Sequence, residues 1–394
     1  MAGAERSLRV LMALPDRRVR GGPPSHLYLL RDSLRDCGVD VRGFTFGGRT
    51  HTETMAQKIR QRLADLIRLS IQIARLRPDL VHLNSAFDRN GLLRDVFFAP
   101  MCKLLGRKVV MKFHGSEESL ASNRRVPWRW MTRLLLRSCD AVCVLSEEER
   151  RYFEREHSYG CYHVVKNALD FSRYEGNHDF RGRYNIPRDR PLLLFIARFI
   201  EPKGIFEVIR AMPEIHKRHA VFTAFVGDGP VRAEAEALCR AMGLWAHVMF
   251  TGYIPEDETV AAYLGSDLLV FPTYHSEGMP MVLFHAMAAG LPIVTTRIRA
   301  AADWMVDGKH CLFVPPKSVP DLVTATMKLL DSPETRAAMA KAGKELVRSF
   351  DRVSVAREFL ELYQSVLRDG RSAGESQCAD SGTSEEVQPA ARCP

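Results

Sequence analysis

The stretch that decides the fold is residues 191–212, which read PLLLFIARFIEPKGIFEVIRAM. Residues 192–196 form an apolar run with the length of a buried strand, and residues 205–217 have the apolar spacing of a helix. A short turn that contains Lys203 and Gly204 joins them. A buried strand followed directly by an amphipathic helix is the unit from which parallel α/β sheets are built.

The same unit recurs on both sides of this stretch. Toward the N-terminus, the pattern predicts helices at 25–37 and 57–77, and strands at 8–14, 39–46, 80–83, 108–113 and 141–145. The helix at 57–77 is predicted from one apolar stripe that includes Ile59, Leu63, Ile67 and Ile71. Toward the C-terminus, strands are predicted at 221–226, 248–250, 268–271 and 293–295. The alternation predicts two tandem Rossmann-like, doubly wound parallel-sheet domains that face each other across a cleft.

Composition suggests where the domains end. We expect an N-terminal domain at 1–168, a linker rich in Asn, Arg, Gly and Pro at 169–190, and a C-terminal domain at 191–351. Residues 369–394 contain almost no large apolar side chains, so we expect a disordered tail there.

The charge of the chain is unevenly distributed. Residues 1–190 hold 35 basic and 22 acidic residues, a net charge of +13, whereas residues 191–368 hold 19 and 20, a net charge of −1. The first half is therefore expected to be the half that meets an anion. The hydrophobic share of 46% and charged share of 26% exclude a collagen-like or wholly disordered chain.

No targeting or membrane-spanning segment is predicted. The first apolar run, at 8–15, is too short and too charged for a signal peptide, and the weakly polar stretch at 279–296 is interrupted by Pro, His and Gly. We expect a cytoplasmic protein, or one that is peripheral on the cytoplasmic face of the membrane.

Two cations stand where an anion is expected to bind. Arg198 follows the strand at 192–196 and Lys203 precedes the next helix. Cations at a strand end beside a helix N-terminus suit a multiply charged anion such as a diphosphate. Two exposed loop charges are the simpler interpretation of these residues alone. Gly227, after the strand at 221–226, lets the backbone approach a ligand or turn sharply.

The segment 276–290, SEGMPMVLFHAMAAG, holds the densest set of candidate groups. Glu277 lies in the loop after a predicted strand, Pro280 suits a first helical turn, and Gly290 suits the position after the helix. The N–H groups of that first turn are expected to take phosphate oxygens. If the helix begins near Met279, His285 lies one to two turns further, on the side nearest the cleft. The alternatives are a helix-dipole charge for Glu277 and a satisfied, partly buried histidine for His285.

Taken in order, these motifs resemble a known family. Arg198 with Lys203-Gly204, residues 227–230, residues 250–252 and the segment 277–290 are similar to the C-terminal domain of retaining GT-B glycosyltransferases of family 4. Gly21-Gly22 with His26, His114-Gly115 and residues 167–170 resemble motifs of its N-terminal domain. The resemblance covers about residues 8–367.

The resemblance implies a retaining glycosyltransferase that uses a nucleoside-diphosphate sugar as co-substrate, with no cofactor and no metal, and a helix near 352–368 that crosses back to the first domain. The chain contains no Asp-x-Asp metal-diphosphate signature. The implied catalytic residues are Arg198 and Lys203 at the diphosphate, His114 at the donor sugar and Glu277 at its hydroxyls. The implied donor-binding residues are Gly21, Gly22, Gly227, Gly278, Met279, Pro280, Met281 and His285.

Two positions depart from the family pattern. His285 stands where the family has a second Glu that holds the ribose, and an imidazole cannot accept two hydrogen bonds as a carboxylate can. Residues 299–303, Arg-Ala-Ala-Ala-Asp, replace a Gly-Gly-x-x-Glu loop, which places the charge of Arg299 near the cleft and leaves Asp303 a capping role.

A basic stripe marks the first domain. Arg125, Arg129, Arg133 and Arg137 are four residues apart, and Trp128 and Trp130 lie among them. On a helix these form one cationic face, which fits an anionic membrane surface. An ordinary solvated helix face is the alternative, and no nucleic-acid motif accompanies the charge.

These features predict transfer of a sugar to a glycan or lipid-linked acceptor in cell-surface polysaccharide or glycolipid synthesis. Three other functions fit the same residues: a catalytically weak sugar-nucleotide binder, a membrane-associated scaffold of GT-B shape, and a hydrolase or phosphorylase of this fold.

Overall fold

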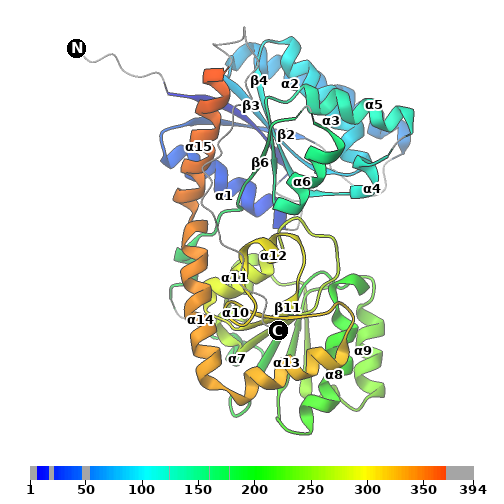
Figure 1. Cartoon of the computed structure of the whole chain (residues 1–394), viewed down its shortest axis with the longest axis vertical. Helices are drawn as coiled ribbons and strands as arrows, with labels where there is room; N and C mark the ends of the chain where they lie inside the picture. The colour runs from blue at the N-terminus through cyan, green and yellow to red at the C-terminus, as the bar shows by residue number, and fades with distance from the viewer. Residues whose placement is uncertain are drawn as a thin grey trace, which may run out of the picture.

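The computed structural model describes residues 7–16, 22–46, 54–123, 125–158, 160–176 and 178–369. Two α/β domains lie one above the other along the long axis of the molecule (Figure 1). Each contains a six-stranded sheet in which all neighbouring strands are parallel. The predicted fold class is therefore confirmed.

The N-terminal sheet has the strand order β2-β1-β3-β4-β5-β6. Its strands are β1 (Arg9–Pro15), β2 (Asp40–Phe46), β3 (Leu80–Phe87), β4 (Lys108–Ser116), β5 (Ala141–Val144) and β6 (Tyr162–Val164). The short strand β6 was not predicted from the sequence. Helices cover both faces of this sheet, and they are α1 (Gly22–Asp36), α2 (Met55–Leu76), α3 (Arg89–Leu104), α4 (Glu118–Ala121), α5 (Val126–Arg137) and α6 (Glu147–Glu156).

The C-terminal sheet has the order β12-β11-β10-β7-β8-β9. Its strands are β7 (Leu192–Ile196), β8 (Phe222–Val226), β9 (Val248–Gly252), β10 (Leu268–Phe271), β11 (Ile293–Thr296) and β12 (Leu312–Val314). Its helices are α7 (Phe180–Arg183), α8 (Ile205–His216), α9 (Arg232–Ala241), α10 (Glu256–Gly265), α11 (Met281–Ala289), α12 (Arg299–Trp304), α13 (Val319–Asp331) and α14 (Pro333–Val347). The chain order reverses between β7 and β10, and ligands bind beyond the strand ends at such a switch point.

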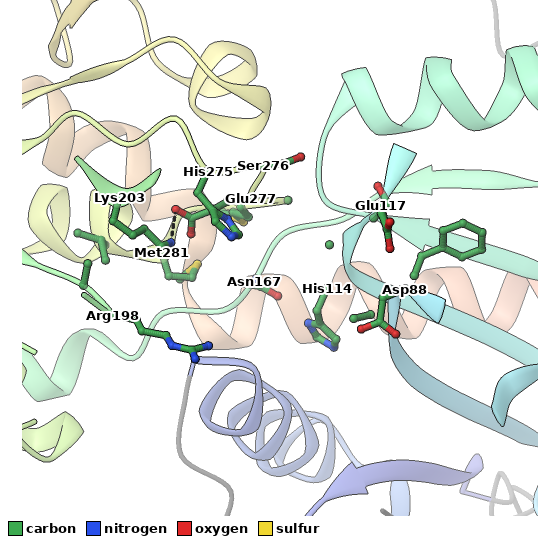
Figure 2. A pocket seen from close by; sticks show the side chains of 18 of the residues that line it. Asp88, His114, Glu117, Asn167, Arg198, Lys203, His275, Ser276, Glu277 and Met281 are labelled. Carbon is green, nitrogen blue, oxygen red and sulfur yellow. Dashed lines mark ion pairs between the residues drawn. The ribbon is translucent and has the colours of Figure 1, made fainter. Parts of the chain in front are cut away.

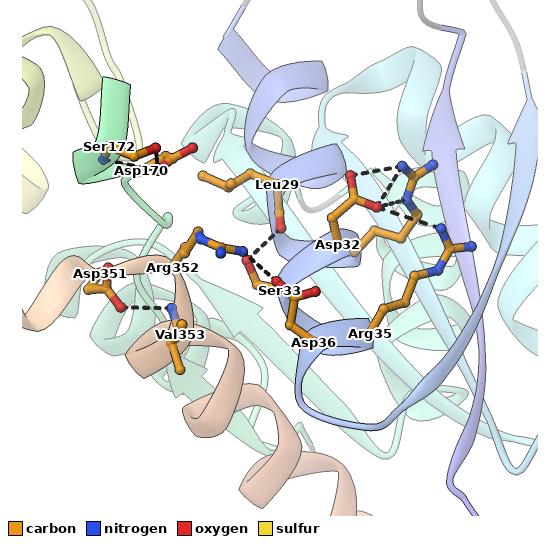
Figure 3. A network of polar contacts seen from close by, with 11 residues as sticks. Leu29, Asp32, Ser33, Arg35, Asp36, Asp170, Ser172, Asp351, Arg352 and Val353 are labelled. Atoms are coloured by element: carbon orange, nitrogen blue, oxygen red, sulfur yellow. Dashed lines mark hydrogen bonds and ion pairs between the residues drawn. The ribbon is translucent and has the colours of Figure 1, made fainter. Parts of the chain in front are cut away.

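The last helix, α15 (Arg352–Asp369), returns to the N-terminal domain. Its apolar side chains join the core of that domain, with Phe359 and Tyr363 buried beside Val10 and Val110. At its start, Arg352 Nη1 donates to Asp36 Oδ2 of α1 at 2.6 Å (Figure 3). The segment expected as a linker contains a 3-10 turn (Phe171–Tyr174) and α7, and Phe180 is buried in the C-terminal core. The predicted tail lies outside the described residues beyond Asp369.

Helix α2 has close to the predicted extent, but four aliphatic residues of its predicted stripe face solvent. Ile59, Leu63, Ile67 and Ile71 are 53%, 56%, 60% and 45% exposed. The residues that pack against the core are Leu69 and Ile73, together with Leu66 of the predicted stripe and Leu76. The sequence of α2 is apolar on two faces, and only packing against the sheet decides which one is buried.

Candidate functional site

A cleft of about 880 Å³ lies between the two domains, at the carboxyl ends of both sheets (Figure 2). The N-terminal domain contributes the ends of β3 and β4, and the C-terminal domain contributes the segments that follow β7 and β10. The predicted residues that line it are His114, Arg198, Lys203, Glu277, Gly278, Met279 and Met281. Residues far apart in the sequence therefore meet in one cavity.

Arg198 is held by the segment that follows β8. On either side of it, the Ala197 N–H donates to Val226 O and the Phe199 N–H donates to Asp228 O at 2.8 Å. Gly227 has φ +132°, and a Cβ atom there would lie 1.9 Å from the Ala197 carbonyl oxygen. Gly227 does not line the cleft. Its absent side chain instead lets this segment pack behind Arg198, so its role in the structure is to support that cation.

Lys203 and Glu277 form an ion pair across the cleft wall, with Nζ 2.5 Å from Oε1 (Figure 2). Lys203 ends a 3-10 turn that Gly204 caps at φ +85°, and a Cβ at Gly204 would lie 2.6 Å from Pro272 O. Glu277 lies in the loop between β10 and α11. The sequence assigned these two residues to different parts of a ligand, whereas the structure pairs them with each other.

The N-terminus of α11 opens beside this pair. Pro280 is its N-cap residue and provides no side-chain hydrogen bond, while Met279 and Met281 line the cleft. Pro280 itself is not a lining residue. At Gly278 the two domains touch, because a Cβ there would lie 3.4 Å from His114 O and 3.3 Å from the Gly115 Cα. A Cβ at Gly278 would therefore be a tight fit against the N-terminal domain.

His114, near the end of β4, is an uncharged imidazole. Asn84 donates through Nδ2 to Ala13 O at 2.9 Å, so its Oδ1 faces His114 Nε2 at 3.2 Å. Nε2 therefore carries the ring proton and Nδ1 is an acceptor. Burial, and next the nearby ammonium of Lys112, hold the pKa of His114 well below its usual value.

His285 does not line the main cleft. It lines a second pocket of about 300 Å³ with His26, which also lines the main cleft. Tyr174 Oη lies 2.5 Å from His285 Nδ1, and the His26 and Tyr263 rings stack on it at centroid distances of 6.2 and 5.9 Å. The predicted position on the side nearest the main cleft is therefore wrong, because His285 faces a second pocket and stacks with His26, the residue that lines both pockets.

The sequence did not single out the carboxylates on the N-terminal wall of the cleft. Asp88 and Glu117 line the cavity (Figure 2). Asp88 caps α3 by accepting the Gly91 N–H at 2.7 Å, and Glu117 accepts the Ser119 hydroxyl at 2.9 Å. An Asp directly before a helix is a capping signal, but the helix that follows Asp88 was not predicted, and nothing local shows that the same residue faces a cavity.

Arg299 and Asp303, in the segment 299–303 that departs from the family pattern, join the domains. The Arg299 guanidinium is buried and donates to Glu149 Oε1 of α6 at 3.1 Å and to Ser116 O at 3.3 Å. Asp303 Oδ2 accepts the Glu147 N–H at 2.8 Å, so it caps a helix of the other domain. Arg299 is therefore a partner of Glu149 and is not a free charge in the cleft.

The remaining predicted residues are placed as follows. Gly21 lies outside the described residues, and Gly22 is the first residue of α1. Arg125 is the N-cap residue of α5, and all four arginines of the basic stripe are exposed. Over the described ranges, no group of three or more His, Cys, Asp or Glu residues could hold a metal ion, and no described helix is long and apolar enough to cross a membrane.

Comparison with known proteins gives two family matches. Residues 177–346 match the family Glycosyl transferases group 1, and residues 20–173 match Glycosyltransferase Family 4. The GDP-mannose-dependent alpha-(1-6)-phosphatidylinositol monomannoside mannosyltransferase of Mycolicibacterium smegmatis is 29% identical over 62% of this chain and 67% of its own length. The alpha-D-kanosaminyltransferase of Streptomyces kanamyceticus is 27% identical over 61% of this chain and 66% of its own.

Solved structures show the same architecture. Sucrose-phosphate synthase from Thermosynechococcus elongatus aligns with a TM-score of 0.75 at 20% identity, over 92% of this chain and 100% of that one. HepE from Anabaena in complex with UDP aligns with a TM-score of 0.71 at 17% identity, over 91% of this chain and 100% of its own. At these identities the likeness establishes the shared fold.

Proposed function

This chain belongs to the group 1 glycosyltransferases of GT-B fold, and from that premise we propose that it is a retaining, metal-independent hexosyltransferase. The donor is a nucleoside-diphosphate sugar, and the acceptor is a hydroxyl group of a glycan or lipid-linked precursor of a cell-surface polysaccharide or glycolipid. One observation carries the proposal: the cleft between the domains gathers Arg198, Lys203, Glu277 and His114 around one cavity.

The cations of the C-terminal wall suit the leaving group. When the bond between the anomeric carbon and the diphosphate oxygen breaks, negative charge collects on the diphosphate and the sugar gains oxocarbenium character. Arg198, Lys203 and the N–H groups at the start of α11 stabilise that negative charge without a metal ion. The chain has no Asp-x-Asp signature, in keeping with such a mechanism.

Because Lys203 is paired with Glu277, donor binding exchanges one partner of Lys203 for another. A donor phosphate that binds Lys203 replaces the Glu277 carboxylate as its partner. The released carboxylate then accepts hydrogen bonds from the hydroxyls of the donor sugar. Donor binding thus substitutes one set of charge-assisted hydrogen bonds for another, and the charge of Lys203 stays compensated throughout.

Retention follows if the acceptor attacks from the face that the diphosphate leaves. The acceptor oxygen forms the new bond to the anomeric carbon as the old carbon–oxygen bond breaks, and its proton passes to a departing phosphate oxygen. Asp88, Glu117 and the uncharged His114 are hydrogen-bond acceptors on the N-terminal wall, which suits a polyhydroxylated acceptor.

We place the protein at the cytoplasmic face of an anionic membrane. The α5 arginines Arg125, Arg129, Arg133 and Arg137 are exposed, and so is Trp130. Helix α2 adds the exposed aliphatic stripe, and every exposed charged side chain on α2 is basic, since Asp65 is buried against Arg68. On such a surface, aliphatic side chains insert into the lipid and the neighbouring cations bind lipid phosphates. Together these contacts give the surface its affinity for the membrane.

The proposed function is tested by donor binding. Thermal shift with a panel of UDP-, GDP-, ADP- and dTDP-sugars is expected to show stabilisation by one nucleotide, because a ligand of the native state raises Tm. Arg198→Ala and Lys203→Ala are expected to lose that shift while keeping the Tm of the free protein. Arg210→Ala, on an exposed position of α8, serves as the matched control.

The outcome also separates the alternatives. Binding without transfer to any hydroxyl acceptor would favour the sugar-nucleotide binder. Absence of binding at millimolar concentration, with magnesium or with EDTA, would refute the proposed transferase and favour the scaffold. Release of free sugar or sugar phosphate would favour the hydrolase or phosphorylase.

A further inference from the structure

Lys112 is a lysine in the interior of the N-terminal domain. It lies on β4, in register with Asn84 of β3 and Cys143 of β5, and is 2% exposed. Its side chain extends toward α15, where Nζ lies 5.1 Å from the centroid of the Phe359 ring. Burying a charged side chain this deeply costs folding free energy unless the charge is paired.

No carboxylate compensates this ammonium group within the part of the chain that the structure describes. Its Nζ donates one hydrogen bond, to Asn167 Oδ1 at 2.8 Å. Burial lowers the pKa of Lys112 to about 8, so the side chain is still largely protonated at neutral pH. The Cys143 thiol beside it stays protonated, because burial raises its pKa to about 12.

Three buried imidazoles interact with this ammonium group, which adds to the effect of burial in keeping them uncharged. Burial first, and then Lys112, lower the pKa of His82 to about 3 and that of His114 well below its usual value. His26 of α1 has a pKa of about 3 through burial, His285 and Lys112. On the α15 side, Tyr363 hydrogen-bonds His82. On the cleft side, the charged groups that line the same cavity as His114 are Asp88, Glu117, Arg198, Lys203 and Glu277.

We propose that Lys112 is a positioning residue for glycosyl transfer: its ammonium fixes the Asn167 amide beside the His114 ring that Asn84 orients, so that the cleft offers a donor and an acceptor to one sugar hydroxyl. This inference rests on the proposed function, since it assigns a task to residues of the same cleft. Lys112 itself is not a lining residue and acts through Asn167 and His114, which are.

The hydrogen-bond directions lead to this pairing. Asn167 Oδ1 accepts from Lys112, which leaves the Nδ2 amide as the group that can donate to a ligand. His114 Nε2 donates to Asn84 Oδ1, which leaves Nδ1 as an acceptor. A hydroxyl both donates and accepts, so one sugar hydroxyl satisfies the two groups together. Protonation of His114 would turn its acceptor into a second donor and break the pairing.

Lys112→Met tests the inference, because methionine fills similar space without charge. We expect the KM for the donor sugar to rise about tenfold, as expected for loss of a hydrogen bond held by a charged group. We also expect the His114 pKa to rise, measured by NMR of 13C-labelled histidine with His114→Gln to assign the signal. A lower kcat/KM below pH 6.5, relative to the wild type, should accompany that rise.

The stability of the variant distinguishes positioning from a structural role. The folded pKa of Lys112 lies below that of an unfolded lysine, so its burial costs stability below pH 8, and the cost fades as the pH rises toward 10.5. Lys112→Met should therefore keep or raise Tm at pH 7, and the gain should shrink at alkaline pH. A lysine needed only for folding would lower Tm when replaced.

Two controls make the outcome decisive. Lys108→Met changes a partly exposed lysine on the same strand, paired with Asp140, and should leave the His114 pKa and the donor KM unchanged. Lys112→Arg keeps the charge and should keep the His114 pKa low. An unchanged His114 titration and an unchanged donor KM in Lys112→Met would overturn the inference. The His114 titration and the Tm measurement need no substrate. Both can therefore be interpreted even if the donor panel refutes the proposed transferase activity.

Discussion

The N-terminal and C-terminal sheets each contain six parallel strands, yet different side chains stand beyond their strand ends. The C-terminal wall of the cleft presents two cations, Arg198 and Lys203, and one carboxylate, Glu277, although residues 191–368 carry a net charge of only −1. The N-terminal wall presents Asp88, Glu117 and a neutral His114, although residues 1–190 carry a net charge of +13. The nearly neutral half therefore holds the cationic wall of the cleft.

The difference shows that the net charge of a domain does not predict which wall of the cleft carries the cations. Only the first half was predicted to meet an anion, whereas both cations that line the cleft at the switch point, Arg198 and Lys203, belong to the C-terminal domain. The excess basic residues of the N-terminal domain include the exposed arginines on α5 and the exposed basic residues on α2. In the proposed function they face a lipid surface, while the cleft faces the donor.

The largest effect on stability is expected at the contact between the two domains, where Arg299 pairs with Glu149. Arg299→Met leaves the buried Glu149 carboxylate without its cationic partner. We expect a loss of about 3 kcal/mol in the free energy of unfolding, the usual scale for breaking a buried pair from one side. Denaturant unfolding measures it.

The double variant Arg299→Met with Glu149→Gln removes the uncompensated charge as well, so it should recover part of that loss. Arg297→Met, at an exposed position just before α12, should cost little. Equal losses in Arg297→Met and Arg299→Met would mean that the buried pair does not join the domains.

A change on the C-terminal wall tests the exchange between Lys203 and Glu277. Glu277→Gln is expected to lower kcat/KM for transfer about 100-fold, because a charged acceptor of sugar hydroxyls is lost. The affinity for the bare nucleoside diphosphate should stay the same or increase, because Lys203 no longer has to leave a carboxylate. Calorimetric titration with nucleotide and with nucleotide sugar separates these effects, and weaker binding of the bare nucleotide would contradict the exchange.

Substitutions on the exposed stripe of α2 test whether the basic N-terminal domain faces a lipid surface. Leu63→Gln with Ile67→Gln should lower binding to vesicles that contain anionic lipid about tenfold, since two aliphatic side chains no longer insert. Tm should not change, because both residues are exposed. Vesicle sedimentation measures the binding.

Val306→Gln, an exposed apolar position of the C-terminal domain, should leave that binding intact. Arg129→Glu with Arg133→Glu should abolish it while transfer to a soluble acceptor continues. If the α2 variant binds vesicles normally but changes from dimer to monomer, the stripe is a self-association surface.

The smallest effect on stability is expected at Asp303, which caps helix α6 of the other domain. Asp303→Ala removes the acceptor for the Glu147 N–H at the start of α6. Loss of a capping side chain costs about 1 kcal/mol. Hydrogen exchange should quicken at the first turn of α6 in the N-terminal domain although the substitution lies in the C-terminal domain, and unchanged exchange there would show that the cap is dispensable.

Much of the fold could be predicted because its signals are local. The strands β7 and β10 have their predicted bounds, since a short apolar run between turn residues is nearly sufficient to define a buried parallel strand. The three-residue strands β6 and β12 went unpredicted, because runs this short have no period of their own and depend on a neighbouring strand to form.

The residues of the candidate site also fall into two groups: those that the local sequence reveals and those that only the fold reveals. Arg198, Lys203 and Glu277 could be singled out because strand-end and helix-start positions are visible in the sequence. Asp88, Glu117 and Lys112 could not, because each stands in an ordinary local context and becomes notable only through what the tertiary fold places around it.

The sequence by itself determined the two doubly wound domains and which side chains follow their strand ends, because periodicity and turn chemistry act over a few residues. Only the tertiary structure decided that Lys203 pairs with Glu277, that Arg299 is buried on Glu149, and that the aliphatic stripe of α2 faces outward. These outcomes depend on contacts between residues distant in the chain, where burial and charge compensation select one arrangement among several that the local pattern allows.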